Sequence, residues 1–257
     1  MGQVTNPTGP GPATPKGVTN FDPAATDGYF IGDDNQFFGI LDLVRITDPG
    51  GTPTMIPFVQ ITTAAYQTPL AVEHQGNNHI LGPGTGLLDG NDTRVMNASM
   101  QNGTLWLAHG TALDSTGDGG TGTPDRDGVR WYQIGSPAGT PEILQSGTIF
   151  DPSITPTPRS YTYGSVNVSG QGHAAFGFTL VGANDYASVG TDGRLLTDTS
   201  GTTQGVQLAT VGLAAYNNTF DNGQLTTDGR RRWGDFSNTQ VDPDDNMTFW
   251  TIQEYTE

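Results

Sequence analysis

The sequence predicts an all-β fold, and three observations lead to that prediction. Glycine (37 residues) and proline (17 residues) together exceed a fifth of the 257 residues, which favours many turns between short elements. Short apolar or alternating runs recur between these turns along most of the chain. No stretch shows the 3.6-residue apolar period of an amphipathic helix.

The predicted elements follow one another as strand, turn and strand. Residues 1–19 are rich in Pro, Gly and Thr and are predicted to be a tail or linker, while residues 20–257 form the β region. Turn clusters such as D-P-G-G-T-P and D-P-D-D-N separate the strands. The predicted strands are 28–31, 37–46, 55–61, 94–100, 105–109, 129–134, 143–150, 161–168, 174–181, 207–213, 233–241 and 248–255.

A repeat is visible within this series. V-M-N-A-S-M-Q-N-G-T-L-W-L-A-H-G (95–110) is a strand of small residues, an Asn-Gly turn and a strand centred on a tryptophan. The same plan recurs at 163–180 and 233–255, and residues 27–43 are a candidate earlier copy. Small residues suit a crowded inner strand and aromatic residues suit a wider middle strand, so we interpret the copies as blades of a β-propeller. A β-sandwich fits the number of strands equally well, but it does not account for the repeat.

The spacing of the copies indicates an incomplete ring. Their central strands, near Leu105, Ala175 and Phe249, lie about 70 to 74 residues apart, whereas a minimal four-stranded blade needs about 40 to 50. The last copy has two of the roughly four strands of a blade. We therefore expect a partial propeller of about three and a half to four blades of a longer ring. Either the ring continues in further blades, or strands of another chain close it.

Charge and composition restrict the compartment and the partners. The formal charge is −16, with one lysine and nine arginines, and this balance repels nucleic acid and anionic membranes. There is no cysteine, and no run approaches the roughly 18 apolar residues of a membrane span. The N-terminal stretch lacks the apolar core of a signal peptide. We expect a secreted, extracellular or cell-surface protein whose signal peptide is not in this chain.

Arginines precede the predicted inner strands of three copies. Arg94, Arg159 and Arg232 hold this position. If their guanidinium groups converged at one mouth of the ring, they would form a clamp for a carboxylate or sulfate. The alternative is that each arginine ties neighbouring blades together.

Other candidate binding or catalytic residues lie around the last arginine. Trp233 is a candidate sugar platform, although tryptophan in a strand is usually part of the core. Asp235 and Glu254 are the best acid and base candidates, since a glycosidase needs two carboxyl groups about 5 to 9.5 Å apart. Tyr163 or Tyr255 could serve as the nucleophile of a sialidase-type reaction, and neither stands in a distinctive sequence context.

One acidic turn has the residue types of a calcium site. Asp242, Asp244 and Asn246 alternate as oxygen donors suited to Ca²⁺, so one structural calcium ion is an expectation. Met247 stands where an EF-hand needs glycine, which excludes that motif. A tight turn with side chains capping backbone amides explains the pattern equally well. A second acidic stretch carries Asp114, Asp118, Asp125 and Asp127.

A histidine pair gives a weaker metal signal. His74 and His79 lie five residues apart in the loop E-H-Q-G-N-N-H. This spacing allows a zinc site, but ordinary hydrogen-bonded histidines are the stronger interpretation.

The chain resembles a family of uncharacterised secreted bacterial β-propeller proteins. The resemblance rests on strings that include D-G-Y-F-I-G-D-D-N-Q-F-F, N-V-S-G-Q-G-H-A-A-F-G-F and R-W-G-D-F-S…D-P-D-D-N-M-T-F-W-T-I-Q-E-Y, and it covers about residues 17–257. Members are similar to sialidase-like propellers in overall shape, and they are typically longer on both sides. The resemblance implies export and supplies no catalytic residues.

The expected function is extracellular binding or scaffolding, with a glycan or a surface protein as partner and without nucleic-acid binding or membrane insertion. The alternative is a carbohydrate-active hydrolase or lyase that uses an arginine-lined channel mouth. The sequence leaves open whether the protein is an enzyme.

Overall fold

The chain folds into β-strands joined by turns and loops. The structure is a computed structural model that describes residues 11–34, 36–48, 50–217 and 229–257, and this part contains no helix. It therefore has no helix long and apolar enough to cross a bilayer. The strands are β1 (Lys16–Asn20), β2 (Asp27–Asp33), β3 (Ile40–Thr47), β4 (Thr54–Thr62), β5 (Val95–Gln101), β6 (Thr104–Leu113), β7 (Arg126–Gly135), β8 (Glu142–Ile149), β9 (Ser160–Val168), β10 (Ala174–Gly182), β11 (Asp185–Arg194), β12 (Gln207–Thr210), β13 (Asn238–Val241) and β14 (Phe249–Ile252).

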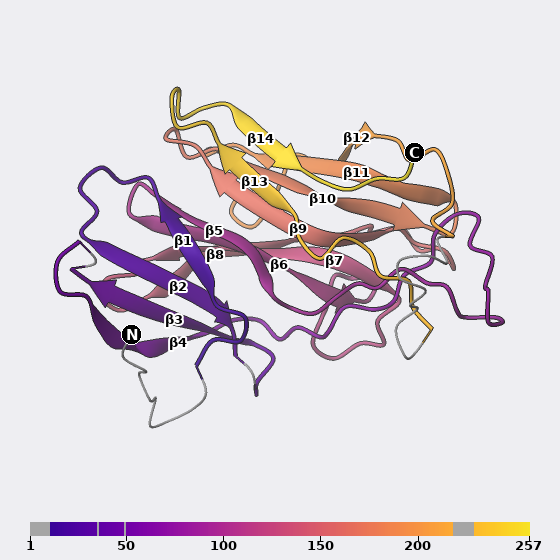
Figure 1. Cartoon of the computed structure of the whole chain (residues 1–257), viewed down its shortest axis with the longest axis horizontal. Helices are drawn as coiled ribbons and strands as arrows, with labels where there is room; N and C mark the ends of the chain where they lie inside the picture. The colour runs from indigo at the N-terminus through magenta and orange to yellow at the C-terminus, as the bar shows by residue number, and fades with distance from the viewer. Residues whose placement is uncertain (1–10, 35, 49, 218–228) are drawn as a thin grey trace.

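The strands form antiparallel meanders of sequence neighbours. The first meander is β1–β4, the second is β5–β8 and the third is β9–β12, while β13 and β14 form a separate hairpin. A short parallel pairing of β1 with β5 joins the first two meanders into one eight-stranded sheet. Figure 1 shows the second meander between the first and the third, with the hairpin beside the third.

The all-β prediction is confirmed, and two of the observed strands, β1 and β11, were not among those predicted. Each predicted strand corresponds to an observed one, although β12, β13 and β14 are shorter than predicted. β11 was not predicted. β1 lies partly within the segment 1–19 predicted as a tail, so that boundary was wrong at residues 16–19, while residues 1–10 lie outside the described part. The first meander therefore begins before the candidate copy at 27–43.

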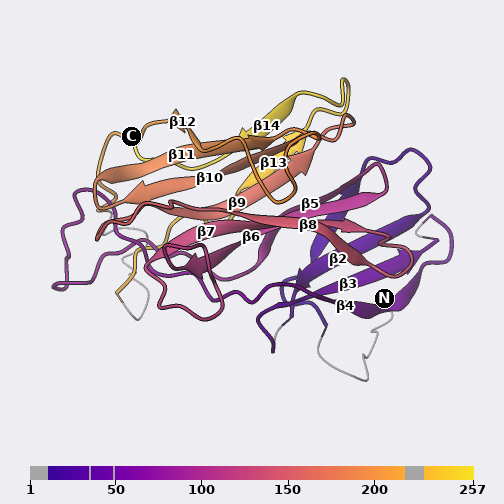
Figure 2. The same cartoon turned by 180° about the vertical axis from the view of Figure 1, so that it is seen from behind.

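Two hydrophobic cores lie on opposite faces of the second meander. Leu105 and Leu107 of β6 pack in the core shared with β2, β3 and β4, whereas Trp106 and Ala108 pack in the core shared with β9 and β10. This alternation follows from the two-residue period of a strand. The second meander is thus buried on both faces, and Figure 2 shows the same order of layers from behind. Burying one large apolar side chain contributes roughly 1.5–3 kcal/mol.

A buried polar network joins β5, β9 and β13. The Asn97 amide donates to the carbonyl oxygens of Val166 and Thr239, both at 2.8 Å, and its Oδ1 accepts from the Val166 N–H at 3.0 Å. The hydroxyls of Ser165 and Thr239 lie 2.8 Å apart. Buried polar groups need such partners. The first strands of three units are consequently held together by side chains.

The long connection from β4 to β5 crosses to the far end of the molecule. Val72 and Leu88 form an antiparallel bridge, and Leu88 also forms a parallel bridge to Arg231. This brings residues 72–89 beside the segment that leads into β13. The candidate site lies at this junction.

Candidate functional site

The three predicted arginines each form an ion pair with an aspartate. Arg94 binds Asp92 through two hydrogen bonds, Nε to Oδ1 at 2.7 Å and Nη2 to Oδ2 at 2.8 Å. Arg159 binds Asp185 in the same two-point manner, at 2.9 and 2.8 Å. Both arginines directly precede a strand, β5 and β9 respectively. In each pair the guanidinium group donates two parallel hydrogen bonds to one carboxylate of the same chain.

The third arginine lines a small cleft beside the hairpin. Arg232 donates through Nη2 to Oδ2 of Asp235 at 2.6 Å. The cleft has a volume of about 250 Å³, and Tyr216, Trp233 and Glu254 also line it. Two predicted carboxyl groups, the predicted tryptophan and one predicted arginine therefore meet in one place. Tyr216 was not predicted, because nothing in its loop sequence shows that it packs against residues near 233.

Trp233 contributes mainly to the core. Its ring is 5% exposed, its Nε1 donates to Thr179 Oγ1 at 3.2 Å, and it meets Tyr216 edge to face at 4.9 Å between ring centroids. The next residue, Gly234, lies under a carboxylate, because a Cβ added there would be 2.7 Å from Glu254 Oε2. Trp233 thus forms the floor of the cleft, and the carboxylate of Glu254 lies over the neighbouring Gly234.

Arg94 lies near the same segment. Its guanidinium carbon is 5.9 Å from the centroid of the Phe236 ring, a cation–π contact. The hydrogen bonds to Asp92 raise the pKa of Arg94, and the charge of Asp235 adds to this effect. Burial favours a raised pKa for Asp92, but the hydrogen bonds from Arg94 outweigh it and lower that pKa. The charge of Asp235 therefore acts on both Arg94 and Arg232. Arg159 is held separately by Asp185.

Tyr163 is fixed in a form that does not favour ionisation. It is 4% exposed, and its hydroxyl donates to the carbonyl oxygen of Asp89 at 2.7 Å. Burial raises the pKa of Tyr163, and the carboxylates of Asp89, Asp235 and Glu254 raise it further. Its φ of 56° lies in the left-handed region, which is strained for a bulky residue. A nucleophile needs the opposite shift.

Asp127 is a fully buried carboxyl group next to this region. It lies on β7 and not in an acidic loop. Its Oδ1 accepts from the Leu70 N–H at 2.8 Å, while its Oδ2 has no hydrogen-bond partner. Burial raises the pKa of Asp127 well above its usual range, and the hydrogen bond from the Leu70 N–H and the charge of Arg230 oppose this shift only in part.

The acidic turn uses its oxygens to cap the backbone. Asp242 accepts from the Asp244 N–H at 2.9 Å and from Trp250 Nε1 at 3.1 Å. Asn246 adopts a left-handed φ of 53°, and its Oδ1 accepts from the Gly170 N–H at 3.2 Å. The described residues contain no group of three or more His, Asp or Glu side chains placed to hold a metal ion. These side chains cap the backbone of the turn, and the calcium ion stays a prediction.

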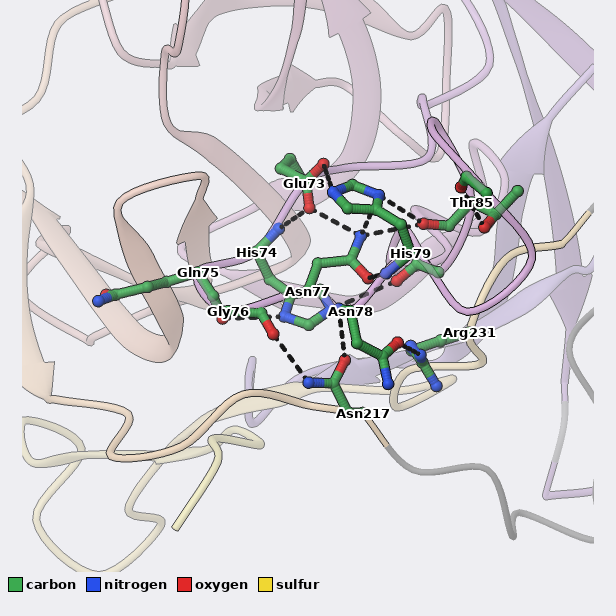
Figure 3. Close-up of polar contacts among 12 residues, drawn as sticks. Glu73, His74, Gln75, Gly76, Asn77, Asn78, His79, Thr85, Asn217 and Arg231 are labelled. Atoms are coloured by element: carbon green, nitrogen blue, oxygen red, sulfur yellow. Dashed lines mark hydrogen bonds and ion pairs between the residues drawn. The ribbon is translucent and has the colours of Figure 1, made fainter.

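The loop that carries His74 and His79 is held in place by a network of hydrogen bonds. His74 is buried between the carbonyl oxygens of Gln75 and Gly86, and burial lowers its pKa. His79 Nδ1 lies 3.1 Å from the carbonyl oxygen of Thr85, and its Nε2 is 3.8 Å from Glu73 Oε2. Figure 3 shows these contacts.

The same loop is tied to distant segments of the chain. Arg231 Nη2 donates to Asn78 Oδ1 at 2.6 Å, and Asn217 Nδ2 donates to the carbonyl oxygen of Gly76 at 2.8 Å (Figure 3). The loop therefore positions the segment that carries Arg232 and Asp235.

No family model, curated protein or solved structure matches this chain. The resemblance to secreted bacterial propeller proteins stays a prediction, and the function has to be argued from the geometry.

Proposed function

We propose that the chain is a segment of a β-propeller that acts outside the cell as a binding module, with a glycan or a surface protein as its partner. The stacking order supports the propeller over a sandwich. A sandwich has two packed layers, whereas here a middle meander is buried between two others. Four-stranded antiparallel units arranged around a central axis are the basis of a propeller.

The first strands of the units support the same arrangement. β1 pairs with β5, and the Asn97 side chain joins β5 to β9 and β13. In a propeller the first strand of each blade lies nearest the axis. The strong acidic excess supports the extracellular location and argues against nucleic acid as a partner.

The observation that carries the binding proposal is the cleft beside Arg232. The side chains of Arg232 and Asp235 are 54% and 47% exposed, and Glu254 lies beside them. Donors and acceptors of both signs next to aromatic groups suit the hydroxyls of a sugar. Such a cleft offers hydrogen bonds to a ligand without a large apolar contact.

Binding is favoured over turnover by the state of the candidate acids. Asp235 accepts a charge-assisted hydrogen bond from Arg232, so one of its carboxylate oxygens is already engaged by the chain itself. A glycosidase needs one carboxyl group whose pKa is raised by a less polar environment. Glu254 is exposed at the rim of the cleft. Tyr163 is buried with a raised pKa and does not supply a nucleophile.

The second candidate function is a carbohydrate-active hydrolase or lyase. Asp235 and Glu254 line the same cleft, and this observation favours it. A binding module releases its glycan unchanged, whereas a hydrolase or lyase cleaves it.

A glycan array with wild-type protein, Arg232→Gln and Glu254→Gln tests the binding proposal. We expect the wild type to select a subset of glycans and each variant to lose about tenfold in affinity, equal to about 1.4 kcal/mol. Arg45→Gln is the matched control, since Arg45 lies on β3 away from the cleft. Wild-type levels of binding by both cleft variants contradict the proposal.

We also propose that further blades or another chain complete the ring. The β13–β14 hairpin has two strands where each of the three meanders has four, and Trp250 and Ile252 of β14 are 62% and 74% exposed. Sedimentation velocity over a hundredfold concentration range tests completion by a second copy. We expect a single species at the monomer mass if other blades are required, and a concentration-dependent larger species if copies associate.

A further inference from the structure

The outer face of the first meander carries a buried carboxyl group. Leu41 and Leu43 of β3 fill the core, so the alternation of the strand directs Asp42 to the opposite face. Asp42 is 0% exposed, and neither of its carboxylate oxygens has a hydrogen-bond partner among the described residues. A buried carboxylate is unstable without a partner, so this side chain needs either a proton or a cation.

Two further polar side chains lie on the same face as Asp42. Asp42 pairs with Gly32 of β2 on one side and with Gln60 of β4 on the other. Asp34 follows Gly32 by two residues and therefore points the same way. Gln60 Nε2 donates to Asp34 Oδ2 at 3.0 Å. Burial raises the pKa of Asp42, the charge of Asp34 raises it further and Gln60 lowers it, so the two carboxyl groups and the amide are immediate neighbours.

A backbone carbonyl group reaches the same place. The segment before β1 crosses this face, where Pro12 forms an antiparallel bridge with Asp34. A Cβ added at Gly32 would lie only 2.4 Å from the carbonyl oxygen of Ala13. Because Gly32 has no side chain, that oxygen rests against β2 beside Asp34 and Asp42. Two carboxylates, an amide and a carbonyl group therefore gather on one small area of the sheet.

We propose that Asp42, Asp34 and the carbonyl oxygen of Ala13 bind one calcium ion, with the Gln60 amide at the exposed rim and water in the remaining positions. The charge of Ca²⁺ balances that of the two carboxylates. Besides burial, the charges of Asp34 and Asp33 raise the pKa of Asp42, so the site repels anions and attracts a cation. Asp34 Oδ2 accepts a hydrogen bond from Gln60, and a carboxylate oxygen has a second lone pair for a metal ion.

Calcium fits this donor set better than other common metal ions. Carboxylate, carbonyl and amide oxygens are hard donors, and Ca²⁺ takes about six to eight of them in a flexible geometry. Mg²⁺ needs a nearly ideal octahedron and usually keeps several waters. Zn²⁺ prefers histidine and cysteine, and neither belongs to this set.

The proposed site differs from the acidic turn in the state of its oxygens. In the turn, Asp242 accepts from the Asp244 N–H and from Trp250 Nε1. Asp42 accepts no such bond from the described residues. The part of the chain that the structure describes holds no group of three His, Asp or Glu side chains that could bind a metal ion. The proposed site uses two such side chains, because neutral oxygens supply further ligands.

The ion ties the segment before β1 to the outer face of the first meander. That segment leads into β1, which pairs in parallel with β5 and joins the first two meanders. Bound calcium should therefore protect the amides of Gly11 and Ala13 from hydrogen exchange and stabilise this junction. This role is structural, and it holds whether or not the Arg232 cleft binds a glycan.

NMR titration of the ¹⁵N-labelled full chain, stripped with EDTA, tests the site with CaCl₂ and MgCl₂. We expect calcium to shift the amides of Ala13, Gly32 and Asp42 with a Kd of about 10⁻⁴ to 10⁻³ M, the range of extracellular modules. Magnesium should bind at least about tenfold more weakly. The amides of the acidic turn at 242–246 should not move.

Three variants test which carboxylates hold the ion. Asp42→Asn and Asp34→Asn retain the size of the side chain and remove one charge, so each should lose about tenfold or more in calcium affinity. Asp244→Asn removes one charge from the exposed acidic turn and is the matched control. It should bind calcium like the wild type.

Thermal unfolding gives a second readout for the same proteins. At a calcium concentration about tenfold above the Kd, the melting temperature of the wild type should rise by about 3–6 °C relative to EDTA. Asp42→Asn should gain less than about 1 °C, whatever its stability in EDTA, whereas Asp244→Asn should gain as much as the wild type. Because each protein is compared with itself, an effect of the substitution on folding alone does not imitate this result.

Three results overturn the inference. The first is the absence of calcium binding up to about 10 mM, which would show that Asp42 holds a proton in place of a cation. The second is wild-type calcium affinity in Asp42→Asn. The third is loss of calcium binding in Asp244→Asn alone, which would assign the ion to the acidic turn.

Discussion

The side-chain amide of Asn97 donates a hydrogen bond of 2.8 Å to the carbonyl oxygen of Thr239, across 142 residues of sequence. The same amide donates to the Val166 carbonyl oxygen. One side chain on β5 thus joins β9 and β13, which belong to different sheets. Because these groups are buried, their hydrogen bonds have no water to replace them. This contact holds the β13–β14 hairpin against β5 and β9.

Loss of the Asn97 amide should destabilise the fold. Asn97→Ala leaves backbone groups of Val166 and Thr239 without partners, at about 1–3 kcal/mol for each unsatisfied group. We expect a loss of about 3 kcal/mol in the free energy of unfolding, measured by urea titration. Asn238→Ala, at an exposed position of the hairpin, should change it by less than about 0.5 kcal/mol. Equal effects of the two substitutions contradict the buried network.

The core between the second and third meanders should depend on Trp131. This residue is fully buried and stacks on Trp106 at 5.8 Å between ring centroids. Trp131→Ala should cost about 3–5 kcal/mol, because it creates a large cavity. Trp250→Ala, at a residue 62% exposed, should cost less than about 1 kcal/mol. Thermal unfolding monitored by circular dichroism should rank them in that order.

Close packing between the same meanders makes Gly164 sensitive to added volume. A Cβ at Gly164 would lie 2.3 Å from a methyl carbon of Val129. Gly164→Ala should therefore cost about 1–3 kcal/mol through overpacking. Gly139 is exposed, with its nearest contact at 3.8 Å, so Gly139→Ala is the control and should be nearly neutral. Indistinguishable urea midpoints for the two variants would argue against the observed stacking.

A buried carboxyl group should make stability fall as the pH rises. Burial raises the pKa of Asp42 to about 6, and neighbouring Asp34 and Asp33 add to the effect while Gln60 opposes it. The folded state then holds the proton more tightly than the unfolded state. Its contribution to stability is lost between about pH 4 and pH 6.

Asp42→Asn tests this dependence. At pH 7.5 the variant should be more stable than the wild type by about 2 kcal/mol, and the difference should shrink at pH 4. Urea unfolding at both pH values measures it. A variant that is less stable than the wild type at pH 7.5 would show that the ionised carboxylate is favourable in the fold.

The sequence predicted most strands, because their apolar pattern is local. In 105–108 the side chains are all apolar, and they alternate between two different cores. β1 has one apolar residue, Val18, and pairs in parallel with a strand about 80 residues later. β11 is polar and glycine-rich, and it is ordered by pairing with β10 and β12. Strands that are ordered by such non-local pairing show little apolar periodicity in their sequence.

The candidate site was predicted in its residue types more than in its geometry. Arg232, Asp235 and Glu254 were identified because charges stand out near a strand. The pairing of each arginine with an aspartate depends on loop conformations that the sequence does not show. Asp42 was missed for a related reason, since a carboxyl group on a strand gives no sign of burial.

The fate of a bound glycan tests the central claim most directly. Wild-type protein is incubated with a glycan selected on the array, and the sugar is analysed by mass spectrometry after the complex is isolated. The binding-module account predicts a complex whose glycan keeps its full mass over many hours. Accumulation of cleaved glycan that Asp235→Asn or Glu254→Gln abolishes would contradict it and establish the carboxyl pair as catalytic.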